Sequence, residues 1–346
     1  MRRRDRRVLG EGQRPLVGTG GPGEGARADR RRGEGRSGPA VIVFCGYANV
    51  DLTVSVPELP GPGARVQATA VGRGEGGMAA NAAAAAARMG AGVRFAGVVG
   101  GDPASASFLA SLAADGVETG LTSQGGVLTT AVVLVTPDGE RAIISQDDQV
   151  TTAHVANVAG AARDMNAGWL YLDGYRFPAA ADVLGDPAGP GDSGGPRVVV
   201  DLDGCDGVEA MRAAMRAADH ALVGRAQAAA LIGGDAELAA EAAAHRVNLV
   251  VTDGPRGWTM LTPDGGRQAG RAIEVDTVDA TGAGDCFAGA YCAELDRGAS
   301  PLDAARVAAV AAGLSTTRPG ARDGLPRRET VLAYMDANAR FHGEET

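Results

Sequence analysis

The sequence predicts an α/β fold, and two observations point to it. First, short apolar runs with strand character alternate with helical segments along much of the chain. Second, an acid follows the first of these runs after a glycine turn, as expected where the carboxyl end of a strand in an open α/β sheet carries a ligand-binding group. The strand runs are Ala40–Cys45, Trp169–Leu172, Arg197–Leu202, His220–Val223 and Asn248–Val251.

Composition is that of an ordinary enzyme that works in the cytoplasm. Of 346 residues, 45% are hydrophobic and 22% are charged, and residues 40–340 could form one large domain with a sizeable core. No apolar run approaches the roughly 18 residues that a membrane span needs, so we expect no membrane partner. The four cysteines lack C-x-x-C spacing and are expected to be reduced.

Charge is divided unevenly along the chain. Residues 1–39 hold eleven arginines and five acids, a net charge of +6 that leaves −15 for the remainder. Their glycine-rich, weakly apolar sequence predicts a disordered tail. The acidic body argues against nucleic acid as a partner. The sequence contains no lysine, which excludes the lysine of a Walker A loop.

The first strand, Ala40–Cys45, leads into Gly46-Tyr-Ala-Asn-Val-Asp51, so Asp51 is expected at a ligand-binding edge. Two further stretches, from about 52 to 73 and from 129 to 145, alternate in polarity and contain proline and glycine turns. We expect them to pair as a small sheet. Closure of such a lid would exclude water from a reaction.

A helix is predicted after Gly76-Gly77, running through the alanine-rich stretch to Met89 and ending at Gly90. The two glycines let the backbone approach a ligand closely. Asn81 in the first turn supplies both a donor and an acceptor, which suits sugar hydroxyls.

The segment Asp279-Ala-Thr-Gly-Ala-Gly-Asp285 is the most informative part of the chain. Gly282, Ala283 and Gly284 offer convergent backbone amides at the start of an apolar helix expected from Asp285 to about Leu295, which is an anion-binding arrangement. Asp285 could simply cap this helix. Alternatively, it accepts the proton of an acceptor hydroxyl during phosphoryl transfer.

The whole pattern resembles the PfkB, or ribokinase-like, family of carbohydrate and nucleoside kinases over about residues 41–335. The resemblance implies a three-layer α/β/α fold with a doubly wound, mostly parallel sheet and a small β-sheet lid, and a homodimer through that lid. It assigns Asp285 as the base, Gly282, Ala283 and Gly284 as the anion hole, and Asp51 as a sugar contact. It places Asp279 near a possible monovalent-cation site, with K⁺ a possible activator.

In the family, two further segments contact the nucleotide. One is Val250–Gly257, which implies ATP contacts at Thr252, Gly254 and Gly257, although a plain turn between strands explains these residues almost as well. The other is a small-residue helix, Val307–Thr317, which implies that Ala312 lies along the adenine.

One departure concerns Mg²⁺. Many family members carry N-x-x-E after the strand equivalent to His220–Val223, whereas this chain reads Gly224-Arg-Ala-Gln227. The amide and the carboxylate are both lost, so the Mg²⁺ ligands cannot be assigned, although Mg²⁺ can arrive on ATP.

That replacement and the segment Arg318–Pro326 resemble the branch that contains sulfofructose kinase. In that branch, a cationic side chain near the position of Arg65 binds an anionic group of the substrate, and arginine suits this role. The simpler interpretation is that Arg65 is a solvated residue of the lid. Asp173, at the end of a strand, is another candidate sugar contact.

The sequence therefore predicts an ATP-dependent carbohydrate kinase. Two alternatives stay open: a nucleoside kinase of the same fold, and a catalytically silent regulator that binds a sugar or a nucleotide. The aromatic content of 4% favours a sugar acceptor over a base that must be stacked.

Overall fold

The structure, a computed structural model, describes residues 41–138, 141–146, 149–176, 180, 183–184 and 195–342. The predicted tail and most of the glycine- and proline-rich connector at 185–196 lie outside these residues. No helix within the described residues is long and apolar enough to cross a membrane.

The main sheet has nine strands in the order β13-β12-β11-β10-β9-β8-β1-β4-β5. All neighbours from β5 to β11 pair in parallel, and the hairpin strands β12 and β13 pair antiparallel at the other edge. The strands are β1 (Val41–Cys45), β4 (Gly92–Ala96), β5 (Val117–Glu118), β8 (Trp169–Asp173), β9 (Arg197–Asp201), β10 (His220–Gly224), β11 (Asn248–Thr252), β12 (Trp258–Leu261) and β13 (Arg267–Gly270).

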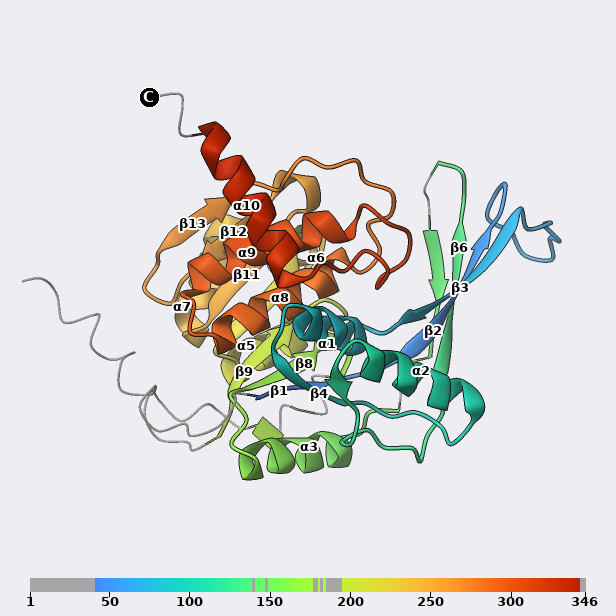
Figure 1. Ribbon diagram of the computed structural model, residues 1–346, viewed down its shortest axis with the longest axis horizontal. Coiled ribbons are helices and arrows are strands. Elements are labelled where there is room, and N and C mark those ends of the chain that lie inside the picture. The colour runs from blue at the N-terminus through green and yellow to red at the C-terminus, as the bar shows by residue number, and fades with distance from the viewer. Residues whose placement is uncertain are drawn as a thin grey trace, which may run out of the picture. The chain divides into compact units, whose positions relative to one another are not determined.

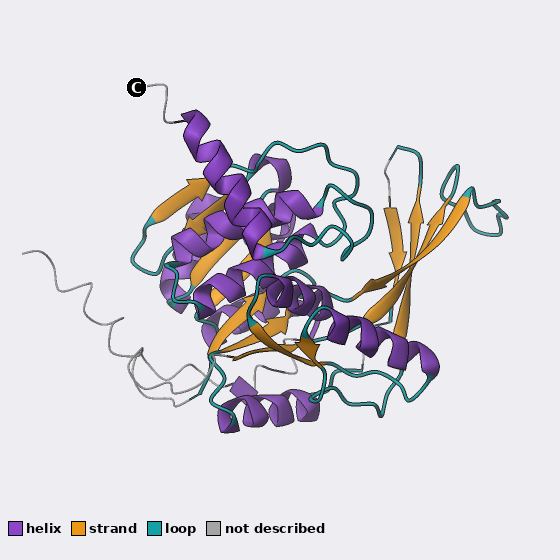
Figure 2. Ribbon diagram, viewed as in Figure 1, coloured by secondary structure: helices purple, strands orange, loops and turns teal. Residues whose placement is uncertain are grey.

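Helices cover both faces of this sheet (Figure 2). Alternate residues of a strand point to opposite faces, so Ile42 and Phe44 of β1 enter one core, and Val43 and Cys45 enter the other. The first core is covered by α1 (Met78–Arg88), α2 (Pro103–Ala114), α8 (Ala283–Asp296), α9 (Pro301–Ser315) and α10 (Arg328–His342). The second is covered by α3 (Thr152–Asp164), α5 (Val208–Ala217), α6 (Arg225–Leu231) and α7 (Asp235–His245).

A second sheet of four strands, in the order β3-β2-β6-β7, projects from the main sheet (Figure 1). Its strands are β2 (Asn49–Ser55), β3 (Ala70–Gly76), β6 (Thr129–Val135) and β7 (Arg141–Ile144). The two stretches expected to form a small sheet do so. The three-layer α/β/α fold with a mostly parallel sheet and a smaller sheet is confirmed.

Helices α1 and α8 pack at very short range, which positions the site described below. A Cβ atom added at Gly289 would lie 2.2 Å from the backbone oxygen of Ala82 and 2.8 Å from the Cβ of Ala85. Any side chain at 289 would therefore push the helices apart. The alanine-rich sequence of α1 and the glycine of α8 allow the first turns of both helices to meet.

Two helices begin earlier than the sequence predicts. Helix α8 begins at Ala283, because Gly282 adopts a left-handed conformation (φ 73°) and forms the N-cap, which leaves Asp285 inside the first turn. The interpretation of Asp285 as a cap residue is therefore wrong. Helix α9 begins at Pro301 after the N-cap Ser300, whose hydroxyl accepts from the amide of Asp303 at 3.1 Å.

Candidate active site

The loop before α8 forms the centre of the candidate site. Gly282 needs its positive φ, and a Cβ there would lie 2.8 Å from the Cβ of Ala321, so the position admits only glycine without rearrangement. A Cβ at Gly284 would meet nothing within 4 Å, and this residue is exposed. The loop is therefore fixed on the Gly282 side and open to solvent at Gly284.

The amides of this loop are not equivalent. The Ala283 amide donates to the carbonyl of Ala280 at 3.2 Å, and the Cys286 amide donates to the carbonyl of Gly282 at 2.8 Å. Within the described residues, the amides of Gly282, Gly284 and Asp285 have no hydrogen-bond partner. Unpaired amides at a helix N-terminus attract an anion. The open donors are thus Gly282, Gly284 and Asp285, whereas Ala283 has a partner.

Asp285 contacts a residue predicted to bind the acceptor. The amide Nδ2 of Asn81, from the first turn of α1, donates to Oδ2 of Asp285 at 2.8 Å. Burial raises the pKa of Asp285 to about 6; the Asn81 hydrogen bond and the charge of Arg322 oppose this shift, and Asp203 and Asp51 add to it. A carboxylate with a pKa near neutrality is suited to accepting a proton from a substrate.

The buried side chain of Arg322 bonds to Asn81, and the sequence analysis did not assign Arg322 a role. Arg322 is 6% exposed. Its Nε donates to Oδ1 of Asn81 at 2.9 Å, and its Nη1 contacts Oε2 of Glu75, at the end of β3, at 2.8 Å. Its Nη2 has no hydrogen-bond partner among the described residues. Arg322 therefore joins the small sheet to Asn81 and, through it, to Asp285.

Asp51 is on β2 of the small sheet, near enough for its charge to raise the pKa of Asp285. Its Oδ1 accepts from Nδ2 of Asn49 at 2.7 Å, and burial raises its pKa. A Cβ at Gly76 would lie 2.4 Å from Oδ2 of Asp51 and 2.7 Å from Oδ1 of Asn49, so glycine makes room for both side chains. Asn49 is buried, and its Oδ1 has no partner within the described residues. It forms part of this cluster, although the sequence analysis gave it no role.

Gly77 and Asp173 support the neighbouring backbone. Gly77 is the N-cap of α1 with φ 98°, and a Cβ there would lie 2.6 Å from the carbonyl oxygen of Tyr47. Asp173 is 1% exposed, and its Oδ2 accepts from the Tyr47 amide at 2.8 Å. These contacts hold the turn between β1 and β2 in place.

Two acids at the end of β9 occupy the region where the N-x-x-E motif is missing. Oδ1 of Asp203 accepts from the Gly224 amide at 2.9 Å, and a Cβ at Gly224 would lie 3.3 Å from its Oδ2. Burial raises the pKa of Asp203 and of the neighbouring Asp201. The side chain of Gln227 bonds to the Gly204 amide and the Leu202 carbonyl.

This donor set fits a hard cation only in part. Carboxylate oxygens such as those of Asp203 are ligands that Mg²⁺ accepts. The described residues nevertheless contain no group of three or more acids, histidines or cysteines arranged to hold a metal ion. Most of the ligands of Mg²⁺ would therefore have to come from a bound phosphate and from water.

The residues predicted to contact the nucleotide belong to two parts of the chain, the segment that follows β11 and helix α9. Thr252 ends β11, and its hydroxyl donates to the Val223 carbonyl at 3.4 Å. Gly254 begins the short helix η4 (Gly254–Arg256), and a Cβ at the following Gly257 would lie 2.1 Å from the Gly270 carbonyl oxygen. Gly257 is therefore explained by the approach of β13. Ala312 is half-buried in α9.

Two further residues singled out in the sequence, Arg65 and Asp279, form no hydrogen bond or ion pair with Asp285 that the described residues show. Arg65 is exposed in the loop between β2 and β3, and it makes no contact with the cluster around Asp285 in the described part of the chain. Oδ1 of Asp279 accepts from the amide and hydroxyl of Thr281, and its Oδ2 accepts from the Gly320 amide at 2.9 Å. These bonds tie the loop before α8 to the loop after α9.

Known proteins match this chain over most of its length. The family described as "pfkB family carbohydrate kinase" matches residues 40–328. An ATP-dependent ribose-1-phosphate kinase of Halopiger xanaduensis is 28% identical over 85% of this chain and 97% of its own length. A ribokinase of Bacillus subtilis is 27% identical over 84% and 97%. The crystal structure of a putative ribokinase from Agrobacterium tumefaciens superposes with a TM-score of 0.71 at 25% identity, over 88% of this chain and 99% of that one.

Proposed function

The chain belongs to the PfkB family of carbohydrate kinases, and on that premise we propose that it transfers the γ-phosphoryl group of ATP to a hydroxyl group of a sugar. The relatives named above, a ribokinase and a ribose-1-phosphate kinase, support a ribose-type acceptor. Phosphotransfer to an alcohol is the activity of the family.

One observation carries this proposal: a carboxylate with a raised pKa lies beside open backbone amides. Asp285, with its pKa raised to about 6, is in the same helical turn as the unpaired amide of Gly284. Phosphoryl transfer needs few covalent steps from the protein, so positioning and electrostatic stabilisation supply most of the rate. A base and open backbone amides within one helical turn provide both the positioning and the electrostatic stabilisation.

In the proposed reaction, the acceptor hydroxyl donates its proton to Asp285 as its oxygen bonds to the γ-phosphorus and the bond to the β-phosphate oxygen breaks. The amides of Gly282 and Gly284 stabilise the charge on the transferring group. Asn81 holds Asp285, and Asp51, held by Asn49, orients other hydroxyls of the acceptor. The small sheet that carries Asp51 and Glu75 would close over the acceptor and exclude water.

Mg²⁺ would neutralise the phosphate charge of ATP. We propose that Asp203, adjacent to Gly224, supplies the acidic contact in place of the missing N-x-x-E motif. Asp279 stays our proposed contact near a monovalent cation such as K⁺: its oxygens accept three hydrogen bonds from the chain, and a carboxylate has about four acceptor sites.

A nucleoside acceptor would require an aromatic ring for stacking. The aromatic pair at the carboxyl ends of β1 and β8 is Tyr47 and Tyr175, whose ring centroids are 5.1 Å apart in an edge-on arrangement. The ring of Tyr175 also lies against Gly204, because a Cβ there would be 2.6 Å from it. Tyr175 is nevertheless 41% exposed, so our preference for a sugar rests on the relatives and on the low aromatic content of the chain.

The small sheet also supports a homodimer. Besides Val50 and Ala142, strand register places six apolar residues on the face opposite to Asp51, together with Arg73 and Glu75. Of the six, Val71 and Ile144 are 64% and 66% exposed, and the others are half-buried. An apolar sheet face of this kind is typical of a protein interface. The six residues are Leu52, Val54, Val71, Val132, Leu134 and Ile144.

The pKa of Asp285 predicts how activity depends on pH. Because Asp285 must be ionised to accept a proton and its pKa is raised to about 6, kcat/KM should fall as the pH decreases through 6. Each further decrease of one pH unit should lower kcat/KM about tenfold. A pH profile of kcat/KM in buffers of constant ionic strength tests this. A rate that is flat down to pH 4.5 would show that Asp285 is not the base.

The proposal is tested by coupled ADP release with Mg²⁺-ATP and a panel of acceptors: ribose, ribose 1-phosphate, fructose, fructose 6-phosphate, sulfofructose, 2-keto-3-deoxygluconate and adenosine. A sugar-dependent rate supports the kinase and identifies its acceptor. A rate with adenosine alone would favour the nucleoside kinase. Thermal stabilisation by ATP or a sugar without turnover would favour the silent regulator.

A further inference from the structure

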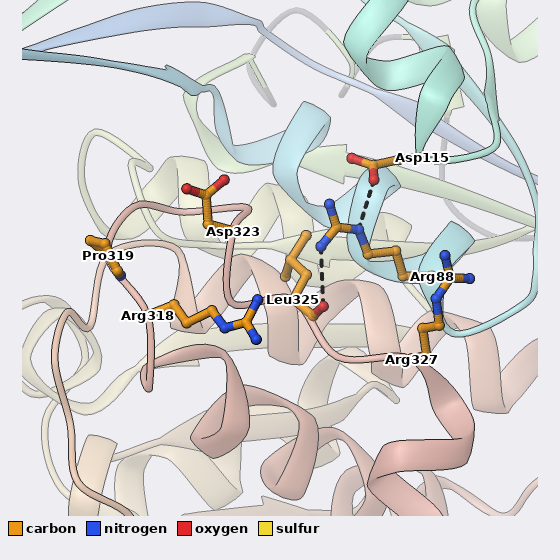
Figure 3. Close-up of a pocket in the computed structure, with 7 residues that line it drawn as sticks. All are labelled: Arg88, Asp115, Arg318, Pro319, Asp323, Leu325 and Arg327. Atoms are coloured by element: carbon orange, nitrogen blue, oxygen red, sulfur yellow. Dashed lines mark hydrogen bonds and ion pairs between the residues drawn. The ribbon is translucent and has the colours of Figure 1, made fainter.

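A hollow lined by none of the residues of the candidate active site lies at the end of α1. It has a volume of about 500 Å³ and is bounded by the end of α1, the end of α2 and the loop between α9 and α10 (Figure 3). Asp285 and the amides before α8 do not line it. Small-molecule sites typically have volumes of about 300–1,000 Å³. The hollow is therefore large enough for a ligand of its own.

Its lining is rich in arginine. Arg88, Arg318 and Arg327 contribute guanidinium groups, and Asp115 and Asp323 contribute carboxylates. Nε of Arg88 pairs with Asp115 at 2.7 Å, so these two charges neutralise each other. In Figure 3, Arg318 and Arg327 lie on opposite sides of Arg88, and the carboxylate of Asp323 points away from Arg88.

The charge of Arg318 and Arg327 is not neutralised by a neighbour. Both are exposed, and the side chain of neither forms an ion pair or hydrogen bond within the described residues. Some exposed arginines, such as Arg306 with Asp303 at 3.1 Å, have acidic partners, whereas others, such as Arg65 and Arg216, have none within the described residues; Arg318 and Arg327 differ from these in lining one hollow. The planar guanidinium group binds phosphate oxygens through two parallel hydrogen bonds.

We propose that this hollow is a second binding site, for a small molecule that carries a phosphate group. Arg318 and Arg327, on either side of Arg88, supply the positive charge that attracts the phosphate, while the ion pair of Arg88 with Asp115 holds the floor in place. The volume exceeds that of phosphate itself, so it accommodates a phosphate monoester.

Arg88, on the floor of the hollow, is linked to Asp285 through hydrogen bonds on both sides of Arg322, one to its backbone and one from its side chain. Nη1 of Arg88 donates to the carbonyls of Arg322 and Leu325 at 2.9 and 3.1 Å. The Arg322 side chain then bonds to Asn81, and Asn81 bonds to Asp285. A ligand that holds Arg318 and Arg327 would order the loop that carries Arg322. We therefore expect it to alter the rate of phosphoryl transfer, a step that rests on the proposed function.

Binding is tested without turnover, by calorimetry at low ionic strength with inorganic phosphate and with ribose 5-phosphate as separate probes. The double variant Arg318→Gln/Arg327→Gln is compared with a control of equal charge change, Arg216→Gln/Arg306→Gln. Both control residues are exposed and lie on α5 and α9, outside the hollow. We expect the wild type and the control to bind alike, and the pocket variant to bind at least one probe about tenfold more weakly.

Unchanged affinity for both probes in the pocket variant would overturn the proposal, because the phosphate would then be bound elsewhere, for instance at the amides before α8. Absence of binding to the wild type would also overturn it. The coupling is tested by the effect of inorganic phosphate on ADP release, which should differ between the wild type and the pocket variant. Because calorimetry needs no catalysis, an inactive wild type would contradict the proposed function and leave the binding test intact.

Discussion

Replacement of Asp285 by Asn should lower kcat by roughly 10² to 10⁴-fold, the usual contribution of a positioned base. Asn can still accept the hydrogen bond that Asn81 donates at 2.8 Å, so the variant changes the proton acceptor with little change of shape. The amides of Gly282 and Gly284 are untouched. ATP should therefore bind with nearly unchanged affinity, as measured by calorimetry.

The fold of this variant should be at least as stable as that of the wild type. The folded-state pKa of Asp285 is raised from 3.8 to about 6, so any stabilisation from its protonated form is present below pH 3.8 and is lost as the pH rises through 6. At pH 7.5 the ionised carboxylate is unfavourable in the folded state, and Asn removes that charge. A melting temperature well below that of the wild type would attribute the loss of activity to misfolding, and a fully active variant would exclude Asp285 as the base.

Replacement of Arg322 by Met should affect both catalysis and stability. Its charge lowers the pKa of Asp285 and of Asp51. Without it, the pKa of Asp285 should rise, and the decline of kcat/KM at low pH should begin at a higher pH than in the wild type. Loss of the pair with Glu75, whose side chain is 30% exposed, should lower the free energy of unfolding by about 2 kcal/mol, below the 3–5 kcal/mol of a fully buried pair.

Matched variants separate charge from structure. Arg322→Lys keeps the charge and should leave the pH profile closer to that of the wild type than Arg322→Met does. Adding Glu75→Gln to Arg322→Met removes the charge that lost its cationic partner, keeps an oxygen that can accept from the Ser111 hydroxyl, and should recover part of the stability, as urea unfolding would measure. A pH profile that is identical in wild type and Arg322→Met would show that Arg322 supports the fold alone.

Much of the fold could be predicted because its strands are short, apolar and fully buried. Trp169–Asp173 and Asn248–Thr252 differ from the predicted strands by one residue each. The start of α9 was missed because Ser300 and Pro301 were not recognised as a cap and first helical residue, although both are typical of a helix start.

The site could be predicted in part. Asp51, Asn81 and Asp285 were each singled out, but the contact between Asn81 and Asp285 depends on the close packing of α1 and α8, which a sequence pattern does not contain. Arg322 could not be assigned, since its burial results from contacts with residues more than 200 positions away. Asp203 had a usable signal: it lies two residues after the end of β9, at the edge of the sheet where ligands bind.

The central claim is that this chain moves the γ-phosphoryl group of ATP to a sugar hydroxyl through Asp285. Phosphorus NMR of a mixture of Mg²⁺-ATP and the best acceptor tests it most directly, because the product of the transfer is observed. The account predicts that wild-type protein produces a phosphomonoester signal in step with ADP, and that Asp285→Asn produces none over the same time. Formation of ADP and inorganic phosphate alone, or of the phosphomonoester at equal rates by both proteins, would contradict it.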